Sequence, residues 1–523
     1  MNDGFLRSGS PVSPSREACV RAWQEGRASV VFSVCPADLL TPVAACLRLQ
    51  ELDGNDGRHT MLLESVEGGV SRGRYSVIAL KPDLIWRCHS GRAAVNRTPE
   101  TDPEAFSEVP GTPLDGLRDL ISESRLELAD GLPPMTAGVF GYLGYDMVRQ
   151  MERLPDAPPD DLNLPEAVLM RPGLFAIFDG VTDELILAAP VRPGAAVPGA
   201  DGEAGEAFDR ATALIARARA CLEAPVPVAA SVPPQAELPV PSSPFSEADF
   251  CAMVERIQEY IAAGDAFQVV PSQRFSTTFT LPSLALYRAL RRVNPAPFLF
   301  HLDFGDFSLV GSSPEILVRL RDGKVTVRPL AGTRPRGSTA EEDARLEADL
   351  LADEKERAEH LMLIDLGRND VGRVSQSGSV KVTEQFVIER FSHVMHISSN
   401  VEGVLRPGLE ALDALIAAFP AGTLTGAPKI RAMEIIDEVE RTRRATYAGC
   451  IGYFGAGGDM DTCIGLRMAV VKDGLMHVQA GCGVVADSVP KLEYEETQHK
   501  ARALFRAAEV AIRQHAGDGA GSS

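Results

Sequence analysis

Short apolar runs typical of β-strands, separated by helical patterns at irregular intervals, constrain the fold of this chain more than any other feature. They occur at 29–34, 60–63, 75–80 and 174–178, and again at 298–304, 307–311, 315–321 and 324–329. These runs do not alternate one for one with helices, as the strands of a parallel sheet do. The turn from Arg321 to Lys324 also suits an antiparallel hairpin. We therefore predict an α+β fold built on antiparallel sheet.

The length of 523 residues exceeds what one ordinary core serves, so we expect one very large domain or two intergrown ones. Residues 1–15 are polar and expected to be disordered, and 16–190 form a first region. Residues 191–245, rich in Pro, Ala and Gly, indicate a linker with one helical piece near 208–222. Ser246, with Asp249 at capping-box distance, opens a second region at 246–510, and 511–523 are expected to be disordered.

Two pairs of glutamates at helical spacing are candidates for metal binding. Residues 353–370 predict an amphipathic helix in which Glu356 and Glu359 share a face, and Glu493 and Glu496 repeat this spacing near the C-terminus. Two such pairs could converge on Mg²⁺, which prefers carboxylate oxygens and completes its shell with an anionic substrate. The alternative is an acidic first turn favoured by the helix dipole, or a solvated charged face.

The overall charge excludes some partners. A net charge of −20 without any Lys/Arg block disfavours nucleic acid and anionic membrane surfaces. Nine scattered cysteines with no C-x-x-C spacing indicate neither a zinc site nor a disulfide framework, in keeping with a reducing cytoplasm. Because the N-terminus lacks an apolar run and no segment reaches the length of a membrane span, we expect a cytoplasmic protein.

A series of motifs, taken in order, resembles the chorismate-utilising enzymes, and most closely the large subunits of anthranilate synthase. The resemblance is dense over about 246–506 and thinner in the first half, where 62–65, 141–146 and 171–172 carry it. The matching segments of the second half are 267–270, 311–315, 330–337, 353–360, 420–433 and 493–500. The resemblance implies two large antiparallel sheets packed face to face, with helices on the outside.

The resemblance also implies an activity. Such enzymes replace the ring hydroxyl of chorismate by an amino group and then expel the enolpyruvyl side chain as pyruvate, giving anthranilate in the first committed step of tryptophan biosynthesis. Poor leaving groups call for a metal and an acid/base set. By match of motif, Glu359 and Glu496 would hold Mg²⁺, with Glu356 and Glu493 beside them, and Glu315 would be the general acid.

The same match assigns the remaining site residues. His396 would assist the elimination, and Gln268 and Thr333 would complete the catalytic set. The substrate-binding residues would be Gly332, Thr333, Tyr447, Arg467, Gly481, Gly483 and Lys500. Without the resemblance, His396 could equally be a core histidine, Arg467 a surface ion pair and Tyr447 a packing residue.

Two positions separate the subfamilies. Isochorismate and salicylate synthases carry a lysine base where this chain has Gln268, and aminodeoxychorismate synthases commonly carry a nucleophilic lysine where it has Ala331. With neither lysine present, direct attack by ammonia remains, as in anthranilate synthase. Thr425 instead matches aminodeoxychorismate synthases, which stay an alternative. A second alternative is a tryptophan-binding regulatory protein without catalysis, disfavoured by the intact site residues.

The resemblance implies two further partners. A glutamine amidotransferase subunit would supply ammonia, since this chain contains no such domain, so a hetero-oligomer is expected. Tryptophan would act as feedback inhibitor at Glu64, Ser65, Pro297, Phe298 and Leu299. The family usually has Tyr and Met in place of Phe298 and Leu299, so the strength of inhibition does not follow from the resemblance.

Overall fold

Two long antiparallel strands, β3 (Ser71–His89) and β7 (Ala167–Asp179), organise the fold of this computed structural model. It describes residues 12–54, 57–67, 71–193, 204–227, 235, 237–391 and 393–519. The pairing of β3 with β7 shifts register between Pro82 and Leu84. Since proline has no backbone N–H, it interrupts the ladder there. The two halves of β3 can therefore pair with different partners: β2 (Met61–Glu67) on the N-terminal side and β4 (Arg92–Asn96) on the other.

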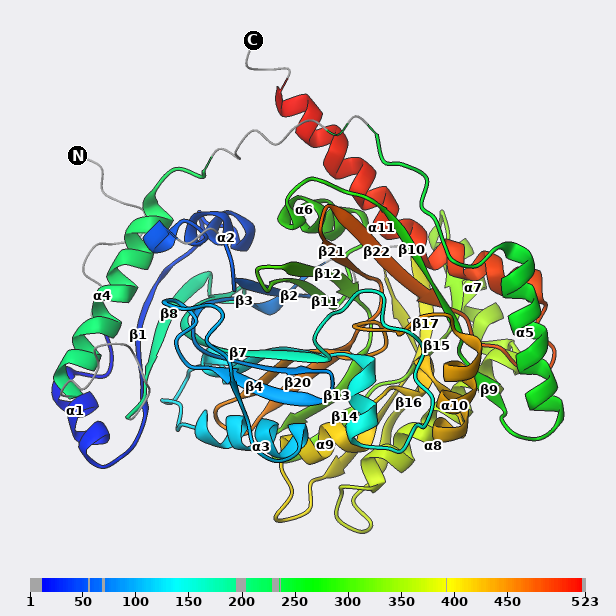
Figure 1. Cartoon of the computed structure of the whole chain (residues 1–523), viewed down its shortest axis with the longest axis horizontal. Coiled ribbons are helices and arrows are strands. Elements are labelled where there is room, and N and C mark those ends of the chain that lie inside the picture. The colour runs from blue at the N-terminus through cyan, green and yellow to red at the C-terminus, as the bar shows by residue number, and fades with distance from the viewer. Residues whose placement is uncertain are drawn as a thin grey trace.

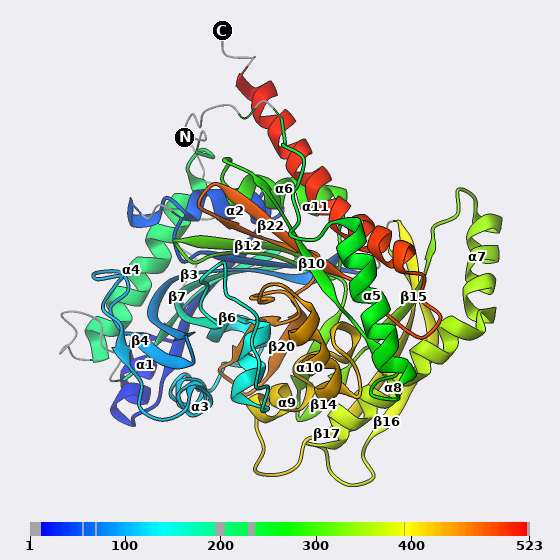
Figure 2. The ribbon, with the colours of Figure 1, turned by 45° about the vertical axis from the view of Figure 1, so that its right-hand side comes forward.

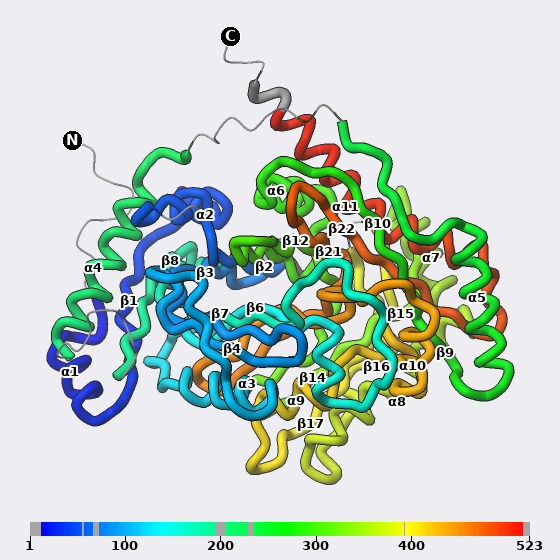
Figure 3. Tube along the Cα trace, in the orientation of Figure 1, coloured from blue at the N-terminus to red at the C-terminus, as the bar shows by residue number. Residues whose placement is uncertain are grey.

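The strands on the β2 side form one wing of the sheet. From β2 the hydrogen-bonded order runs through β11 (Phe298–Asp303), β12 (Phe307–Ser313), β21 (Met468–Lys472), β22 (Leu475–Gly481) and β10 (Ser272–Thr278). On the far side of β7, the order is β8 (Glu184–Val191) and then β1 (Ser29–Pro36). Strands from both halves of the sequence thus lie next to one another in this wing (Figure 3).

The second wing starts at the other end of β7. It runs through β6 (Gly138–Leu143), β19 (Cys450–Gly455), β20 (Met460–Ile464), β13 (Ile316–Arg321), β14 (Lys324–Val327) and β17 (Val394–Val404). Strand β17 also pairs with β15 (Leu330–Pro335) and β16 (Lys381–Arg390), and β5 (Ser107–Glu108) pairs with β4. The β13–β14 hairpin is confirmed, with Asp322 and Gly323 in the left-handed conformation its turn requires. Strands β9 (Gln268–Val269) and β18 (Gly426–Ala427) pair separately.

An apolar layer fills the space between the two wings. It contains Phe300 and Leu309 from the first wing and Phe140 and Tyr453 from the second. A second apolar cluster joins the outer face of the first wing to α2 (Pro42–Leu49), α4 (Ala204–Glu223), α6 (Ser283–Val293) and α11 (Pro490–Gly519). A third joins the second wing to α3 (Pro113–Glu123), α8 (Glu354–Gly372) and α9 (Ala411–Ala418). Figures 1 and 2 show these helices outside the strands.

The predicted mixed α+β class with a large antiparallel sheet is confirmed, and the two wings are connected through β3 and β7. The remaining helices are α1 (Arg16–Gln24), α5 (Glu247–Ala262), α7 (Ala340–Ala352) and α10 (Lys429–Val439). The capping box expected at Ser246 and Asp249 is present at the start of α5. Along the described chain, no helix is long and apolar enough to cross a membrane.

The chain termini and the 191–245 segment need separate comment. Residues 1–11, 194–203, 228–234, 236 and 520–523 lie outside the described residues. Within 191–245 the expected helical piece is α4. The expectation of disorder from 511 onward is wrong up to Gly519, because α11 continues and buries Ala511 and Ile512 in the core under the first wing. Near the N-terminus, Ser13 forms a bridge with Phe32.

Candidate active site

The acidic start of α8 is held by a cap and by an arginine. Asp353 is the N-cap, and its side chain accepts hydrogen bonds from the N–H groups of Lys355 and Glu356 at 3.0 and 3.2 Å. Arg334 of β15 donates to Asp353 at 2.8 Å and to Glu356 at 3.3 Å. Burial, followed by the charge of Glu359, raises the pKa of Glu356. Capping of the helix thus explains the role of Asp353. The charged form of Glu356, by contrast, is disfavoured by burial and by the charge of Glu359.

Two predicted site residues from distant segments, Gln268 and Gly483, lie beside Glu359. The Gln268 side-chain amide donates to Glu359 Oε1 at 3.0 Å. Gly483 lies against this pair, because a Cβ at that position would be only 2.8 Å from Gln268 Nε2. A side chain at 483 would therefore push the amide away from the carboxylate.

The second acidic pair lies on the first turns of α11. Lys500 Nζ is 2.6 Å from Glu496 Oε1 and donates to the Gly481 carbonyl at 2.9 Å. Burial is the main cause of the raised pKa of Glu493, and the charge of Glu496 adds to it. A Cβ on Gly481 would be 2.9 Å from the hydroxyl of Tyr447, so this loop also approaches the buried tyrosine closely.

Residues of both acidic pairs therefore lie close to the loop 481–483. Glu359 lies beside Gly483, while the charges of Glu493 and Glu496 act on Cys482. Within the part of the chain that the structure describes, no three His, Cys, Asp or Glu side chains already surround a common point. The four glutamates therefore form two pairs around the loop and not a preformed cluster.

Glu315 is buried just before β13, where burial raises the pKa of its carboxyl to about 8. The Leu330 N–H, 3.5 Å from Oε1, and the nearby guanidinium of Arg467 act in the opposite direction. Arg467 itself has a left-handed backbone with φ of 47°. The pKa shift means that Glu315 carries its proton at neutral pH and can act as an acid.

His396 is held in one tautomer by the strand beside it. In the β15–β17 ladder it stands opposite Thr333, and its Nδ1 is 2.9 Å from the Gly332 carbonyl oxygen. A carbonyl oxygen only accepts, so Nδ1 carries the hydrogen and Nε2 keeps its lone pair. Burial lowers the pKa of His396 to about 4, and Nε2 has no hydrogen-bond partner among the described residues. His396 is thus a neutral acceptor.

A buried ion pair between Arg444 and Glu440 connects segments of the site. Arg444 donates to the Glu440 carboxylate at 2.6 Å and to the carbonyl oxygens of Leu424 and Val270 at 2.7 and 2.6 Å. Glu440 in turn accepts from the N–H of Ser272 at 2.8 Å. The pair therefore fixes the strand that carries Gln268 against the glycine-rich loop before α10.

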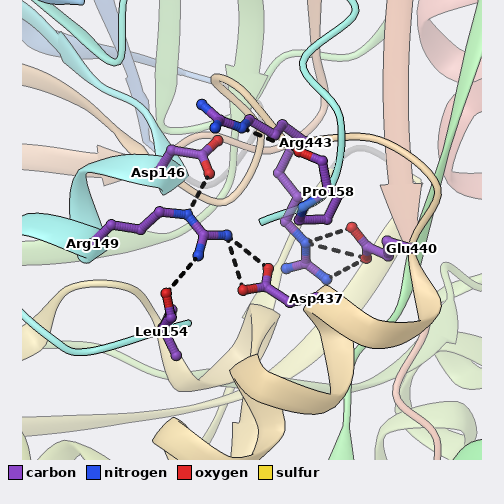
Figure 4. Close-up of polar contacts among 8 residues, drawn as sticks. Asp146, Arg149, Leu154, Pro158, Asp437, Glu440 and Arg443 are labelled. Atoms are coloured by element: carbon purple, nitrogen blue, oxygen red, sulfur yellow. Dashed lines mark hydrogen bonds and ion pairs between the residues drawn. The ribbon is translucent and has the colours of Figure 1, made fainter. Parts of the chain in front are cut away.

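A second arginine connects the first half of the chain to the same helix. Figure 4 shows Arg149 between Asp146, at 3.1 Å, and Asp437 of α10, at 2.8 Å, close to Glu440. Arg443 donates to the Pro158 carbonyl at 3.2 Å in the same view. The segment after β6 is thus held against α10 and against the residues that follow α10.

Comparison with known proteins gives the family. A profile described as chorismate binding enzyme matches residues 81–506. The chain belongs to the chorismate-binding enzymes. Anthranilate synthase component 1 of Cereibacter sphaeroides is 52% identical over 507 residues, covering 97% of this chain and 100% of the relative. The same component of Pseudomonas aeruginosa is 47% identical over 480 residues, covering 91% and 94%.

Solved structures agree with this membership. The crystal structure of anthranilate synthase component I from Streptococcus pneumoniae TIGR4 is 36% identical with a TM-score of 0.73, covering 83% of this chain and 92% of that one. The menaquinone-specific isochorismate synthase of Escherichia coli, at 18% identity and TM-score 0.67, covers 94% and 99% and shares the fold. This chain therefore has the fold of the chorismate-binding enzymes.

In this chorismate-binding enzyme a cavity of about 650 Å³ lies apart from the acidic pairs. All five residues predicted for tryptophan line it: Glu64, Ser65, Pro297, Phe298 and Leu299. The β2–β11 ladder explains their proximity, since it places Glu64 opposite Leu299 and Ser65 opposite Phe298. Arg291 donates to Glu64 at 2.8 and 2.9 Å. The cavity also reaches Leu330 and Phe391, which contact Glu315 and His396.

Sequence reasoning missed several residues of this chorismate-binding enzyme. The hydroxyl of Thr423 lies beside Glu315, and Arg334 holds the start of α8. Thr423 and Arg334 fall inside the quoted motifs, so their position was a signal of importance, although not of role. The Arg444–Glu440 pair has helical i, i+4 spacing, which is too common to single out a buried pair.

Proposed function

We propose that this chain is the chorismate-aminating component of an anthranilate synthase and forms anthranilate, pyruvate and water from chorismate and ammonia. Relatives that are 52% and 48% identical to this chain carry the name anthranilate synthase component 1. The observation that carries the proposal is the glutamine at position 268. An amide is not a base, and the amide of Gln268 donates its hydrogen bond to Glu359, so this position cannot activate water as the lysine of isochorismate synthases does. Ala331 likewise supplies no nucleophilic amine, which leaves ammonia as the nucleophile.

In the proposed first step, ammonia bonds to the ring carbon at one end of the allylic system while the hydroxyl leaves from the other. Glu315, protonated below about pH 8, donates its proton to this hydroxyl, which departs as water. The electron pairs of the two ring double bonds shift toward the carbon that loses oxygen. Glu315, left as a carboxylate beside the cationic Arg467, takes up a proton from the ammonium group formed on the ring, which gives the neutral amine.

In the second step the enolpyruvyl group leaves. His396 Nε2, which has a free lone pair, accepts the proton from the ring carbon that now bears nitrogen. The electron pair released forms the aromatic double bond, and the ether bond from the ring to the enolpyruvyl oxygen breaks. Proton uptake by the enolate then gives pyruvate. Thr333 and the Gly332 carbonyl keep the imidazole in the tautomer that this step needs.

The substrate is a dianion, so the site must supply positive charge. We assign the carboxylates to Arg467, Tyr447, Lys500 and the backbone amides of Gly332, Thr333, Gly481 and Gly483. The oxygen donors of Glu359 and Glu496, with Glu356 and Glu493 behind them, fit Mg²⁺, because burial and mutual charge raise the pKa values of Glu356 and Glu493. When bound, this ion would neutralise the acidic pairs and attract the ring carboxylate.

The proposal includes two further molecules. A glutamine amidotransferase subunit would deliver ammonia, so the working enzyme would be a cytoplasmic hetero-oligomer. Tryptophan would bind in the 650 Å³ cavity between the wings and act as feedback inhibitor. In this proposal 246–510 is the catalytic region, and 16–190 contributes part of the cavity wall, including Glu64 and Ser65.

The decisive experiment mixes the purified chain with chorismate, Mg²⁺ and an ammonium salt at mildly alkaline pH, where ammonia and protonated Glu315 coexist. Anthranilate fluorescence and pyruvate are measured, with Glu359→Gln as a variant that should lose Mg²⁺-dependent turnover. Equal amounts of anthranilate and pyruvate support the proposal. Accumulation of aminodeoxychorismate without pyruvate would replace it by the 4-aminobenzoate branch, and full activity of the variant would refute the metal assignment.

A further inference from the structure

A second cavity, of about 460 Å³, lies at the opposite end of the molecule from the acidic pairs. It is enclosed by α4 on one side and by the interruption of β3 at Lys81 to Asp83 on the other. In Figure 1, α1 and α4 are at the left, while α8, α10 and the start of α11 are at the right. Trp23, Pro82 and Leu214 give the cavity apolar walls.

The walls carry more positive than negative charge, although the whole chain has a net charge of −20. Five basic residues line the cavity against three acidic ones. The acids are already engaged: Lys81 pairs with Asp53 at 3.3 Å and with Glu100 at 3.1 Å, and Arg171 pairs with Asp83 at 2.7 Å. No acidic residue of this wall is left over for a further cation.

Among the described residues, Arg192, just after β8, is the basic residue of this wall that has no hydrogen bond or ion pair. It lines the cavity and is 7% exposed, and its Nε and Nη2 atoms are buried without a hydrogen bond to any described residue. The nearest carboxylates, Asp83 and Glu123, are both bonded to Arg171. Burial lowers the pKa of Arg192 to about 10, so the guanidinium remains charged at neutral pH. An uncompensated buried charge is strongly unfavourable, and an anion in the cavity would remove this cost.

We infer that this cavity is a binding site for a small organic anion, whose carboxylate or phosphate is held by Arg192 and whose apolar body packs against Trp23 and Leu214. The volume is within the range of small-molecule sites. Arginine suits both oxyanions, because its planar fork of donors matches two oxygens at once. The proposed catalytic residues are all elsewhere, so this inference does not depend on the proposed reaction.

The two tryptophans of the chain make binding measurable. Trp23 lines the cavity, whereas Trp86 is 1% exposed in the core under the second wing. Benzoate, phenyl phosphate and inorganic phosphate are titrated into the full-length chain, following tryptophan fluorescence and, independently, the heat of binding. Arg192→Met removes the guanidinium, and Arg210→Met is the matched control, since Arg210 is a half-exposed arginine of the same wall.

Benzoate or phenyl phosphate is expected to change the Trp23 emission and to release or absorb heat, with affinity at least about tenfold weaker in Arg192→Met and clearly less weakened in Arg210→Met, which removes only a half-exposed charge of the wall. The preferred probe tells a carboxylate site from a phosphate site. Because the substitution removes an unpaired buried charge, Arg192→Met should also unfold at the same or higher temperature in anion-free buffer. Absence of binding by the wild type at millimolar probe, or equal binding by Arg192→Met, would overturn the inference, and equal affinity for inorganic phosphate would overturn its apolar part.

Discussion

The proposed catalytic site and the cavity between the wings both contain buried ionisable groups, but these groups differ in whether they have partners. Around the cavity each named charge has a partner: Glu64 is bonded to Arg291, and Asp461 to Arg319 at 3.1 Å. At the proposed catalytic site, Glu315 and His396 are buried without an opposite charge at hydrogen-bond distance, and burial raises the pKa of Glu315 and lowers that of His396.

This difference distinguishes residues that can bind a ligand from residues that can exchange a proton. A paired charge keeps its ordinary state and presents a fixed surface to a ligand. A buried group without a counter-charge takes its neutral form, so Glu315 keeps a proton to give and His396 keeps a lone pair to accept one. Arg192 resembles Glu315 and His396 in having no opposite charge at hydrogen-bond distance among the described residues, but a guanidinium keeps its charge, which an anionic ligand would compensate.

The largest effect is expected from removing the unpaired acid. Glu315→Gln keeps the shape of the side chain and loses the proton, so turnover with ammonia should fall about 10²- to 10⁴-fold. The control is Glu402→Gln, since Glu402 is paired with Lys324 at 3.2 Å on the surface of the sheet. Anthranilate fluorescence measures both variants. A Glu315→Gln enzyme within a factor of about three of wild type would show that the proton comes from elsewhere.

Breaking a buried pair should affect stability instead. Arg444→Met leaves Glu440 charged and without its partner in the interior, so the free energy of unfolding should fall by about 3–5 kcal/mol. Urea denaturation followed by circular dichroism measures this. Arg256→Met is the control, because its ion pair with Glu259 is exposed and should contribute under about 1 kcal/mol. Equal losses of stability in both variants would contradict the expected difference between a buried and an exposed ion pair.

The pH profile reports the unpaired acid directly. Only protonated Glu315 can donate, and its raised pKa of about 8 means that activity is retained below pH 8 and lost as pH rises through that value. With the rate expressed per free ammonia, we expect a decline of about tenfold per pH unit above the pKa. In Glu315→Gln this limb should be absent. A wild-type profile that stays flat beyond pH 9, about one unit above the pKa, would exclude Glu315 as the acid.

The smallest effect is expected in the cavity. Phe298→Tyr with Leu299→Met introduces the residues usual in the family, adding a hydroxyl and an adaptable thioether to its wall. We expect tryptophan inhibition to become about two- to tenfold tighter, with turnover unchanged. Leu302→Met, in the same strand but away from the cavity, should change neither. Weaker inhibition in the double variant would mean that tryptophan does not contact these residues.

The sequence predicted the local features well. The capping box at Ser246, the hairpin at Asp322 and Gly323, and the helix that begins after Asp353 depend on residues within a few positions of each other. The five residues predicted for tryptophan line one cavity, while the binding of tryptophan there stays a prediction. The end of α11 was not predicted, because the polar composition of this segment favours disorder. In the structure the buried side chains of Ala511 and Ile512 hold the helix to the core.

Sequence alone determined which side chains are present in which order, and motif order was enough to identify the family. The tertiary structure decided what state those side chains take. The proton on Glu315 and the isolation of Arg192 come from burial by segments far away in the chain, and the tautomer of His396 comes from its hydrogen bond to the distant Gly332 carbonyl. The free energy of a charge depends on the water and counter-charges around it, and folding alone sets those.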